Sequence, residues 1–277
     1  MDAPPSNVIY PSSFQELFSA WERFPQGVPY AGGTHIIRQQ GKNIIDLPKT
    51  IFCLDKLEEL HRITRTEQFL EVGSMVKLND LLKLGKIVPK ILCTCLENIA
   101  GVQLRNLATV GGNICSLSNL YDLHAPLTAL DTQYELRTAH GTRWVSAARF
   151  NTTNEINVLA EKELLTRIRL PLHQWDYSIY KKFYSEDSYN SEVLVFLVKA
   201  QKNILTDIRV VYKSKTILRN KNSEDILSGK SLPFSRKAAN DFVENWKQFL
   251  SERDNVNEFS KNALINNIEE NVVILSE

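Results

Sequence analysis

The hydrophobic pattern of the first fifty residues predicts short strands around one amphipathic helix. Within residues 14–24, apolar side chains recur at three- and four-residue intervals, at Phe14, Leu17, Phe18 and Trp21. This spacing predicts a helix with a core-facing stripe. Ser13, followed three residues later by Glu16, predicts a capping box at the start of the helix. Short apolar runs predict strands at residues 8–10, 28–31 and 44–47.

Helices and strands continue to alternate up to a junction near residue 172. Period-two patterns predict one hairpin within residues 57–78 and a second within residues 133–148. Helical spacing predicts helices at residues 78–84, 88–100 and 123–130. Pro171 and the polar pair His173-Gln174 mark a junction, so we expect one domain at residues 1–172 and a second at residues 173–277.

The second domain is expected to be a small α+β unit. Its pattern predicts three strands at residues 176–184, 192–202 and 205–213. Helices are predicted after them at residues 223–228, 235–251 and 257–268. The predicted fold class of the whole chain is therefore α+β.

Composition and charge exclude several classes of protein. Of the 277 residues, 43% are hydrophobic and 23% are charged, as in soluble globular proteins. The 33 Lys and Arg residues nearly balance 32 Asp and Glu residues, so no basic field for nucleic acid is expected. We expect no membrane span and no signal peptide. The four cysteines lack metal-ligand spacing, so reduced thiols, a cytoplasmic location and no metal site are expected.

Glycine is scarce, yet four of the 11 glycines occur in the pairs Gly32-Gly33 and Gly111-Gly112. Each pair is expected at the exit of an apolar strand, before a hydrogen-bonding residue. Backbone N–H groups in such loops can bind phosphate, so two loops could hold both phosphates of a dinucleotide. Tight turns that bind no ligand are the alternative. Neither pair has the G-x-G-x-x-G pattern, which disfavours a Rossmann site.

Two longer motifs surround these glycine pairs. Residues 30–35 read Tyr-Ala-Gly-Gly-Thr-His, and residues 103–114 read Gln-Leu-Arg-Asn-Leu-Ala-Thr-Val-Gly-Gly-Asn-Ile. Both resemble the FAD-binding medium subunit of the molybdenum hydroxylases, a family that includes xanthine dehydrogenase and carbon monoxide dehydrogenase. Ser118 and Asp122, the segment 162–168 and the segment 180–183 agree with the family in order. The resemblance therefore covers nearly the whole chain.

The resemblance implies a two-lobed FAD-binding fold of the vanillyl-alcohol-oxidase (PCMH) type, followed by a C-terminal domain of the CO dehydrogenase flavoprotein type. It implies that the two glycine loops wrap the FAD pyrophosphate, that apolar side chains lie near the isoalloxazine, and that Lys181 or Lys182 faces its oxygen edge. FAD is expected to be bound without a covalent bond. The predicted cofactor-binding residues are Tyr30, Ala31, Gly32, Gly33, Thr34, His35, Ile99, Thr109, Gly111, Gly112, Asn113, Ser116, Asp122, Leu165, Tyr180, Lys181 and Lys182.

The resemblance also implies partners. An Fe–S subunit would carry [2Fe–2S] clusters and a large subunit would carry molybdopterin, with electrons passing through FAD on this chain to a soluble acceptor such as NAD. Four scattered cysteines cannot ligate two clusters, which agrees with metals on partners. The acidic stretch at residues 185–187 departs from the family pattern on the acceptor side, which counts against NAD.

Other interpretations of the whole chain and of single residues stay open. The chain could instead be a stand-alone flavin oxidoreductase of the same fold, or a flavin-free assembly subunit. Ile99 and Leu165 could be ordinary core residues, Tyr180 an ordinary strand residue, and Asp122 a helix cap.

Overall fold

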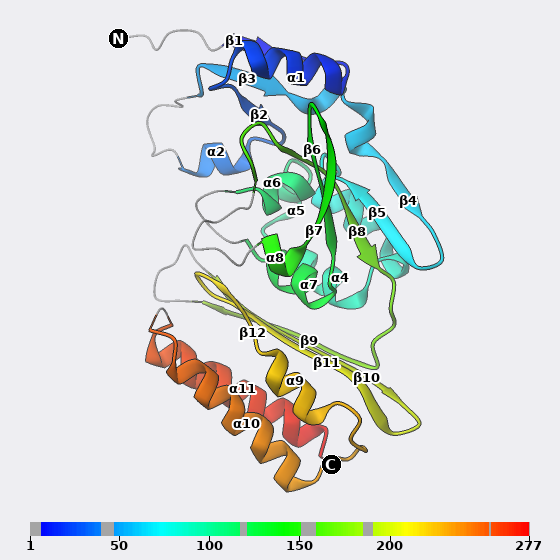
Figure 1. Ribbon diagram of the computed structural model, residues 1–277, viewed down its shortest axis with the longest axis vertical. Coiled ribbons are helices and arrows are strands. Elements are labelled where there is room, and N and C mark those ends of the chain that lie inside the picture. The colour runs from blue at the N-terminus through cyan, green and yellow to red at the C-terminus, as the bar shows by residue number, and fades with distance from the viewer. Residues whose placement is uncertain are drawn as a thin grey trace. The chain divides into compact units, whose positions relative to one another are not determined.

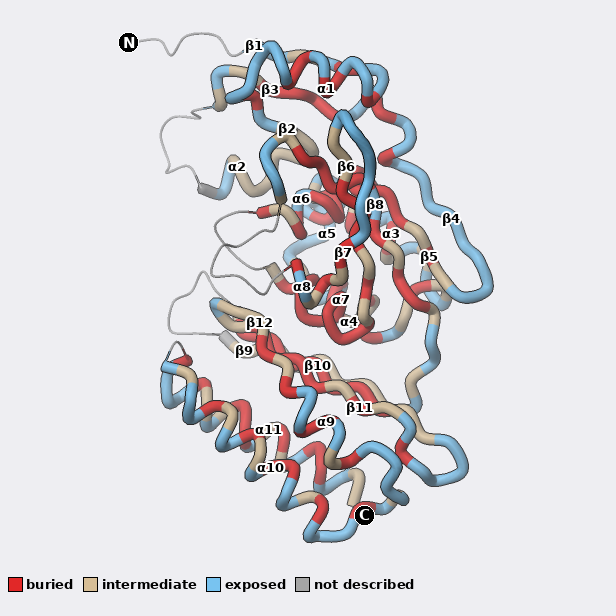
Figure 2. Tube along the Cα trace, in the orientation of Figure 1, coloured by how far each residue is buried: buried red, intermediate tan, exposed pale blue. Residues whose placement is uncertain are grey.

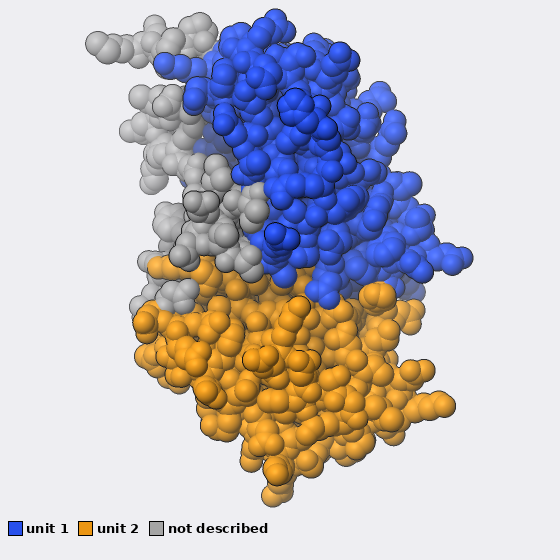
Figure 3. Space-filling view, viewed as in Figure 1, with its two compact units in different colours: residues 1–123, 130–172 blue, residues 124–129, 173–277 orange. Residues whose placement is uncertain are grey.

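The computed structural model describes residues 7–39, 47–116, 121–150, 159–184, 191–254 and 256–276 (Figure 1). The chain divides into two compact units (Figure 3). Unit 1 comprises residues 1–123 and 130–172, and unit 2 comprises residues 124–129 and 173–277. Residues 44–46 of a predicted strand, Ser118 and the acidic stretch 185–187 lie outside the described residues.

Unit 1 begins with a three-stranded parallel sheet in the order β1-β3-β2. Its strands are β1 (Asn7–Ile9), β2 (Val28–Tyr30) and β3 (Thr50–Cys53). Helix α1 (Phe14–Arg23) links β1 to β2, and the short helix α2 (Thr34–Gln39) follows β2. The strands predicted at residues 8–10 and 28–31 are confirmed.

Helix α1 follows the predicted amphipathic pattern. Its four predicted core positions are all buried: Phe14, Leu17, Phe18 and Trp21. The Ser13 hydroxyl accepts from the backbone N–H of Glu16 at 3.2 Å, which confirms the predicted N-cap. The Glu16 carboxylate instead accepts from the Ser12 backbone N–H at 2.7 Å and from the Ser12 hydroxyl at 2.9 Å. In a capping box this carboxylate would accept from the backbone N–H of Ser13, but here it binds the preceding residue, Ser12.

The second sheet of unit 1 has five antiparallel strands in the order β4-β5-β8-β6-β7. They are β4 (Ile63–Arg65), β5 (Phe69–Gly73), β6 (Gln133–Thr138), β7 (Gly141–Ser146) and β8 (Leu164–Pro171). Both predicted hairpins are confirmed as β4-β5 and β6-β7. Strand β8, the last strand of this sheet in sequence, lies between the two hairpins and forms the centre of the sheet.

Short helices connect the strands of unit 1. The chain passes through three 3₁₀ turns, at Leu54–Lys56, Glu58–His61 and Gly85–Ile87. The helices between β5 and β6 are α3 (Leu78–Lys83), α4 (Lys90–Glu97), α5 (Val102–Arg105), α6 (Val110–Ile114) and α7 (His124–Ala129), and α8 (Ala147–Phe150) follows β7. Of these helices, α7 belongs to unit 2. In the described part of the chain, no helix is both long and apolar enough to cross a membrane.

Unit 2 is built on an antiparallel sheet in the order β12-β11-β10-β9. Its strands are β9 (Tyr177–Tyr184), β10 (Ser191–Gln201), β11 (Ile204–Lys213) and β12 (Ile217–Arg219). The helices α9 (Lys221–Leu227), α10 (Arg236–Ser251) and α11 (Glu258–Ile274) follow. The prediction of three strands was wrong, because the sheet has a fourth strand, β12. This strand is only three residues long and shows no period-two pattern in the sequence. Helix α11 also extends beyond its predicted end at residue 268.

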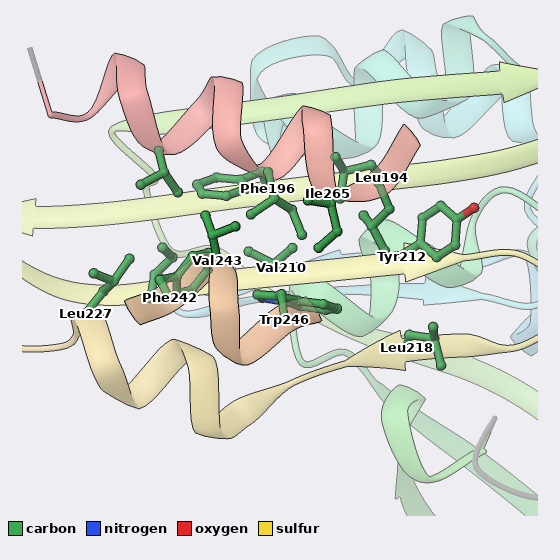
Figure 4. Packing of buried hydrophobic residues seen from close by; sticks show 14 of the residues in the cluster. Leu194, Phe196, Val210, Tyr212, Leu218, Leu227, Phe242, Val243, Trp246 and Ile265 are labelled. Atoms are coloured by element: carbon green, nitrogen blue, oxygen red, sulfur yellow. The ribbon is translucent and has the colours of Figure 1, made fainter. Parts of the chain in front are cut away.

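The sheet of unit 2 is covered on both faces. Leu194, Phe196 and Val198 of β10 pack with the long helices in one core cluster, together with Phe242 and Trp246 of α10 (Figure 4). The alternate β10 residues are also fully buried, at Val193, Val195 and Leu197 (Figure 2). Helix α7 contacts β10 and β11, and the Arg209 guanidinium donates to the Ala129 carbonyl at 2.7 Å. Burial on both faces explains the uninterrupted apolar run of residues 193–198.

Two phenylalanines test this core against the surface of the same unit. We expect Phe242→Ala to lower the free energy of unfolding by about 3–5 kcal/mol, because the fully buried ring leaves a cavity. Phe259→Ala is the matched control, since Phe259 is 77% exposed, and we expect a change within about 0.5 kcal/mol. Urea unfolding of the full-length protein measures both. Equal losses in the two variants would contradict the assigned core.

Candidate functional site

The first glycine pair of unit 1 packs against the 103–114 motif, which contains the second pair. The first pair follows β2, as predicted, and precedes α2, which was not predicted. Gly33 has a φ of +68°, which favours glycine. A Cβ at Gly32 would overlap the carbonyl oxygen of Leu107. The backbone of the 103–114 motif therefore packs directly on the first glycine pair. The structure thus brings together two segments that are about 70 residues apart in the sequence.

The second glycine pair lies in a helix, so its prediction at the exit of a strand was wrong. Thr109 caps α6, and its hydroxyl accepts from the Gly112 backbone N–H at 3.0 Å. The Gly111 N–H donates to the Ser74 carbonyl at 2.8 Å, and a Cβ at Gly111 would clash with Ser74. Gly111 is thus required by packing inside unit 1.

Gly112 differs from the other three paired glycines. It is exposed, and a Cβ there would meet only the Thr109 hydroxyl oxygen, at 3.0 Å. The next residue, Asn113, is 8% exposed, and its Oδ1 is buried without a hydrogen-bond partner among the described residues. Open backbone beside a buried acceptor fits a ligand that carries phosphate and hydroxyl groups.

Arg105, within the 103–114 motif, binds the chain that follows helix α4. Its guanidinium is 9% exposed and donates to the carbonyls of Glu97, Ile99 and Ala100 at 3.3, 2.9 and 2.6 Å. The Glu97 carbonyl ends helix α4, where a cation is favourable, and the other two carbonyls lie just beyond the helix. Ala100 has a φ of +46°, a conformation that costs free energy in an L-residue. Arg105 therefore fixes the half-buried Ile99, one of the predicted flavin neighbours. Arg105 lies within the 103–114 motif, but no role was predicted for it from the sequence.

His35 and Ser116 also meet. The Ser116 hydroxyl lies 3.1 Å from His35 Nδ1, and the Tyr121 hydroxyl lies 2.7 Å from the same nitrogen. Burial lowers the pKa of His35, and the nearby Arg38 cation lowers it further. Asp122, directly after Tyr121, is 6% exposed. Tyr121 was missed from sequence, because no local pattern indicates contact with a residue 86 positions away.

The remaining predicted residues of unit 1 differ in burial. Tyr30, Ala31 and Thr34 are half-buried beside the glycines. Leu165, on β8, is 2% exposed and pairs with Leu136 of β6. The structure therefore places Leu165 in the interior of the sheet.

Tyr180, Lys181 and Lys182 belong to unit 2, where the alternation of β9 separates them. Lys181 Nζ donates to Asn267 Oδ1 at 2.5 Å and to Glu270 Oε2 at 2.7 Å, so it faces α11. Tyr180 and Lys182 lie on the opposite face of the strand, because neighbouring residues of a strand point to opposite sides. One of these two lysines was predicted to face the flavin. The structure directs Lys181 toward α11 and Lys182 to the other face of β9.

A pair of joined glycine segments, with one glycine open to solvent, is typical of a protein that binds a nucleotide cofactor through its backbone. The sequence model of a family described as the FAD binding domain in molybdopterin dehydrogenase matches residues 4–173. The chain therefore belongs to this family. Membership confirms the prediction of an FAD-binding oxidoreductase subunit related to the molybdenum hydroxylases.

Curated relatives agree with the family. The glyceraldehyde dehydrogenase medium chain of Sulfolobus acidocaldarius is 25% identical over 215 residues, which are 76% of either chain. The xanthine dehydrogenase FAD-binding subunit of Escherichia coli O157:H7 is 32% identical over 151 residues, 53% of this chain and 51% of that subunit. Xanthine dehydrogenase 2 of Arabidopsis thaliana is 27% identical over 80% of this chain, which spans only 18% of that protein.

Solved structures confirm the predicted fold. Carbon monoxide dehydrogenase from Hydrogenophaga pseudoflava matches with a TM-score of 0.80 at 20% identity, over 100% of this chain and 98% of that chain. Quinoline 2-oxidoreductase from Pseudomonas putida 86 matches with a TM-score of 0.78 at 18% identity, over 100% of this chain and 97% of that chain.

Removal of the Arg105 guanidinium tests how the site is supported. We expect Arg105→Ala to lower the free energy of unfolding by about 2–4 kcal/mol, because three carbonyls lose a charged donor. Arg62→Ala is the control, since Arg62 is exposed, and we expect a change within about 0.5 kcal/mol. Chemical unfolding measures both. An Arg105 variant as stable as the Arg62 variant would refute this supporting role.

Proposed function

We propose that this chain is the FAD-carrying redox subunit of a molybdenum hydroxylase complex of the xanthine dehydrogenase type. The observation that carries the proposal is the open backbone at Gly112, beside the buried and unsatisfied Oδ1 of Asn113, within the residues that match the family. When bound, FAD would supply the redox chemistry by accepting electrons from partner clusters and passing them to a soluble acceptor such as NAD.

The residues of unit 1 would hold the cofactor without a covalent bond. The segments 31–35 and 109–113 would wrap the pyrophosphate, with Gly112 as the residue of closest approach. Asn113 Oδ1 would accept from a cofactor hydroxyl. Ser116 and Asp122 would contact the nucleotide. Ile99, which is half-buried, would lie beside the isoalloxazine.

Lys182 is the better candidate for the cation at the flavin oxygen edge. Lys181 points toward α11, where it donates to Asn267 and to the Glu270 carboxylate. Lys182 shares its strand face with Tyr180, which the resemblance also assigns to the flavin. A cation there would stabilise the negative charge of the reduced cofactor and raise its potential.

The proposed partners are an Fe–S subunit and a molybdopterin-binding large subunit. Relatives are named as medium chains, which supports assembly with further chains. The four cysteines, at positions 53, 93, 95 and 115, are all free thiols and are scattered along the chain. We therefore expect the native protein to copurify with both partners. Turnover of an organic donor by the isolated chain would instead favour a stand-alone flavin enzyme.

Gly112→Val tests the cofactor site. We expect FAD affinity to fall at least about 100-fold, because the valine side chain fills the open backbone surface, with little change in secondary structure. Dialysis against FAD, followed by flavin absorbance, measures occupancy, and circular dichroism measures the fold.

The control for Gly112→Val places the same side chain at an exposed helical position of unit 2. Asn240→Val, on α10, should leave FAD occupancy unchanged. Full occupancy in Gly112→Val would refute the pyrophosphate assignment. A wild-type protein that cannot be reconstituted with FAD would refute the proposed function itself.

The two neighbouring lysines provide a matched pair for the potential of the bound flavin. We expect Lys182→Met to lower its midpoint potential by about 30 mV, which for two electrons equals about 1.4 kcal/mol. Lys181→Met should leave the potential unchanged, because Lys181 is paired with α11. Spectroelectrochemical titration measures both. A larger shift in the Lys181 variant would reverse the assignment.

A further inference from the structure

The His35 imidazole joins two segments that lie far apart in sequence. His35 is the second residue of α2, and its Nδ1 lies 2.7 Å from the Tyr121 hydroxyl and 3.1 Å from the Ser116 hydroxyl. The His35 and Tyr121 rings meet edge to face, with centroids 5.7 Å apart and planes at 87°. The Arg38 guanidinium lies 5.7 Å from the centre of the Tyr121 ring. One imidazole thus connects α2 to the chain on both sides of residues 117–120.

This junction lies on the opposite side of Gly33 from the backbone contact at Gly32. Gly32, just before Gly33, packs against the Leu107 carbonyl. His35, two residues after Gly33, forms a hydrogen bond with Tyr121. The turn between them, Gly33-Thr34, is therefore fixed at both ends. A loop that is already fixed loses less conformational entropy when a ligand binds, so its fixation favours binding.

The chemistry of the junction requires a neutral imidazole. A neutral imidazole has one bare nitrogen that accepts a hydrogen bond, whereas a charged imidazole has none. Burial and the Arg38 cation lower the pKa of His35, which favours the neutral form at neutral pH. The Tyr121 hydroxyl, the nearer of the two hydroxyls, can then donate to Nδ1.

We propose that His35 and Tyr121 form a positioning latch that holds α2 against the chain leading into Asp122 and so slows the release of FAD. This inference rests on the proposed function, because it assigns regulation of residence time to the same site. Both residues act through the positions of the cofactor-binding segments. Breaking the hydrogen bond frees one end of the first glycine turn and lets the cofactor leave.

The test measures the rate of FAD release from reconstituted full-length protein, by flavin fluorescence after dilution. We expect Tyr121→Phe to release FAD about fivefold to tenfold faster, because the ring contact is kept and one hydrogen bond is lost. His35→Leu should accelerate release similarly, and the double variant should add nothing further, because both substitutions break the same bond. His35→Asn should restore slow release, since its amide oxygen can replace Nδ1 as the acceptor.

Controls separate the latch from a general effect on the fold. Tyr10→Phe changes a tyrosine that is 52% exposed, so release at the wild-type rate is expected. Thermal unfolding of the FAD-free Tyr121→Phe and His35→Asn proteins reports stability alone. Release at the wild-type rate in both Tyr121→Phe and His35→Leu overturns the latch, as do fully additive effects in the double variant. A wild-type protein that binds no FAD overturns the proposed function together with the latch.

Discussion

The approach of two backbones at Gly32 and Leu107 is the constraint on which the candidate site depends. Any side chain at Gly32 would push the 103–114 motif away from the turn after β2. That motif also carries Thr109, whose hydroxyl caps α6, and Gly111, whose N–H is bound to Ser74. Direct backbone packing thus holds the 103–114 motif, which contains the second glycine pair, against the turn that contains the first.

A balanced overall charge is compatible with an anionic cofactor because the charges around the site are local. Arg105 is buried against the carbonyl of Glu97, which ends α4, and against those of Ile99 and Ala100 just beyond it, so it offsets their partial negative charge. Backbone N–H groups can then face a phosphate without a lysine nearby. The near-equal numbers of acidic and basic residues predict no basic field for nucleic acid, and they do not conflict with a dinucleotide held by a few local contacts.

Sequence patterns predicted the elements whose burial is periodic. Helix α1 has a clear stripe, and β10 has an apolar run that spans both covered faces, so both were found. Strand β12 was missed because three residues are too few to show a period. Helix α6 was missed because it contains two glycines, which have low helix propensity. The Thr109 hydroxyl, which accepts from the Gly112 N–H, helps to stabilise the helix despite these glycines.

The site could be predicted from sequence only where a long motif existed. Residues 30–35 and 103–114 were found as motifs, and the structure brings them together. Tyr121 was not found, because its contact with His35 spans 86 positions and leaves no local signal. The lysine pair shows a different limit. Adjacent residues could not be distinguished by sequence, but β9 directs Lys181 toward α11 and Lys182 to the other face.

The glycine pairs are a less direct sign of a ligand than their sequence suggested. Gly32 and Gly111 are explained by contact with Leu107 and Ser74, and Gly33 by its positive φ, so three of the four serve the packing of the protein on itself. Gly112 is the least constrained of the four, since a Cβ there would meet only the Thr109 hydroxyl oxygen, at 3.0 Å. A motif can therefore be rich in glycine because its own segments approach closely, and the ligand-facing part is the glycine that internal packing constrains least. In this chain that glycine lies next to Asn113, whose buried acceptor is unexplained by the described residues. The coincidence of these two observations, rather than the count of glycines, supports the cofactor site.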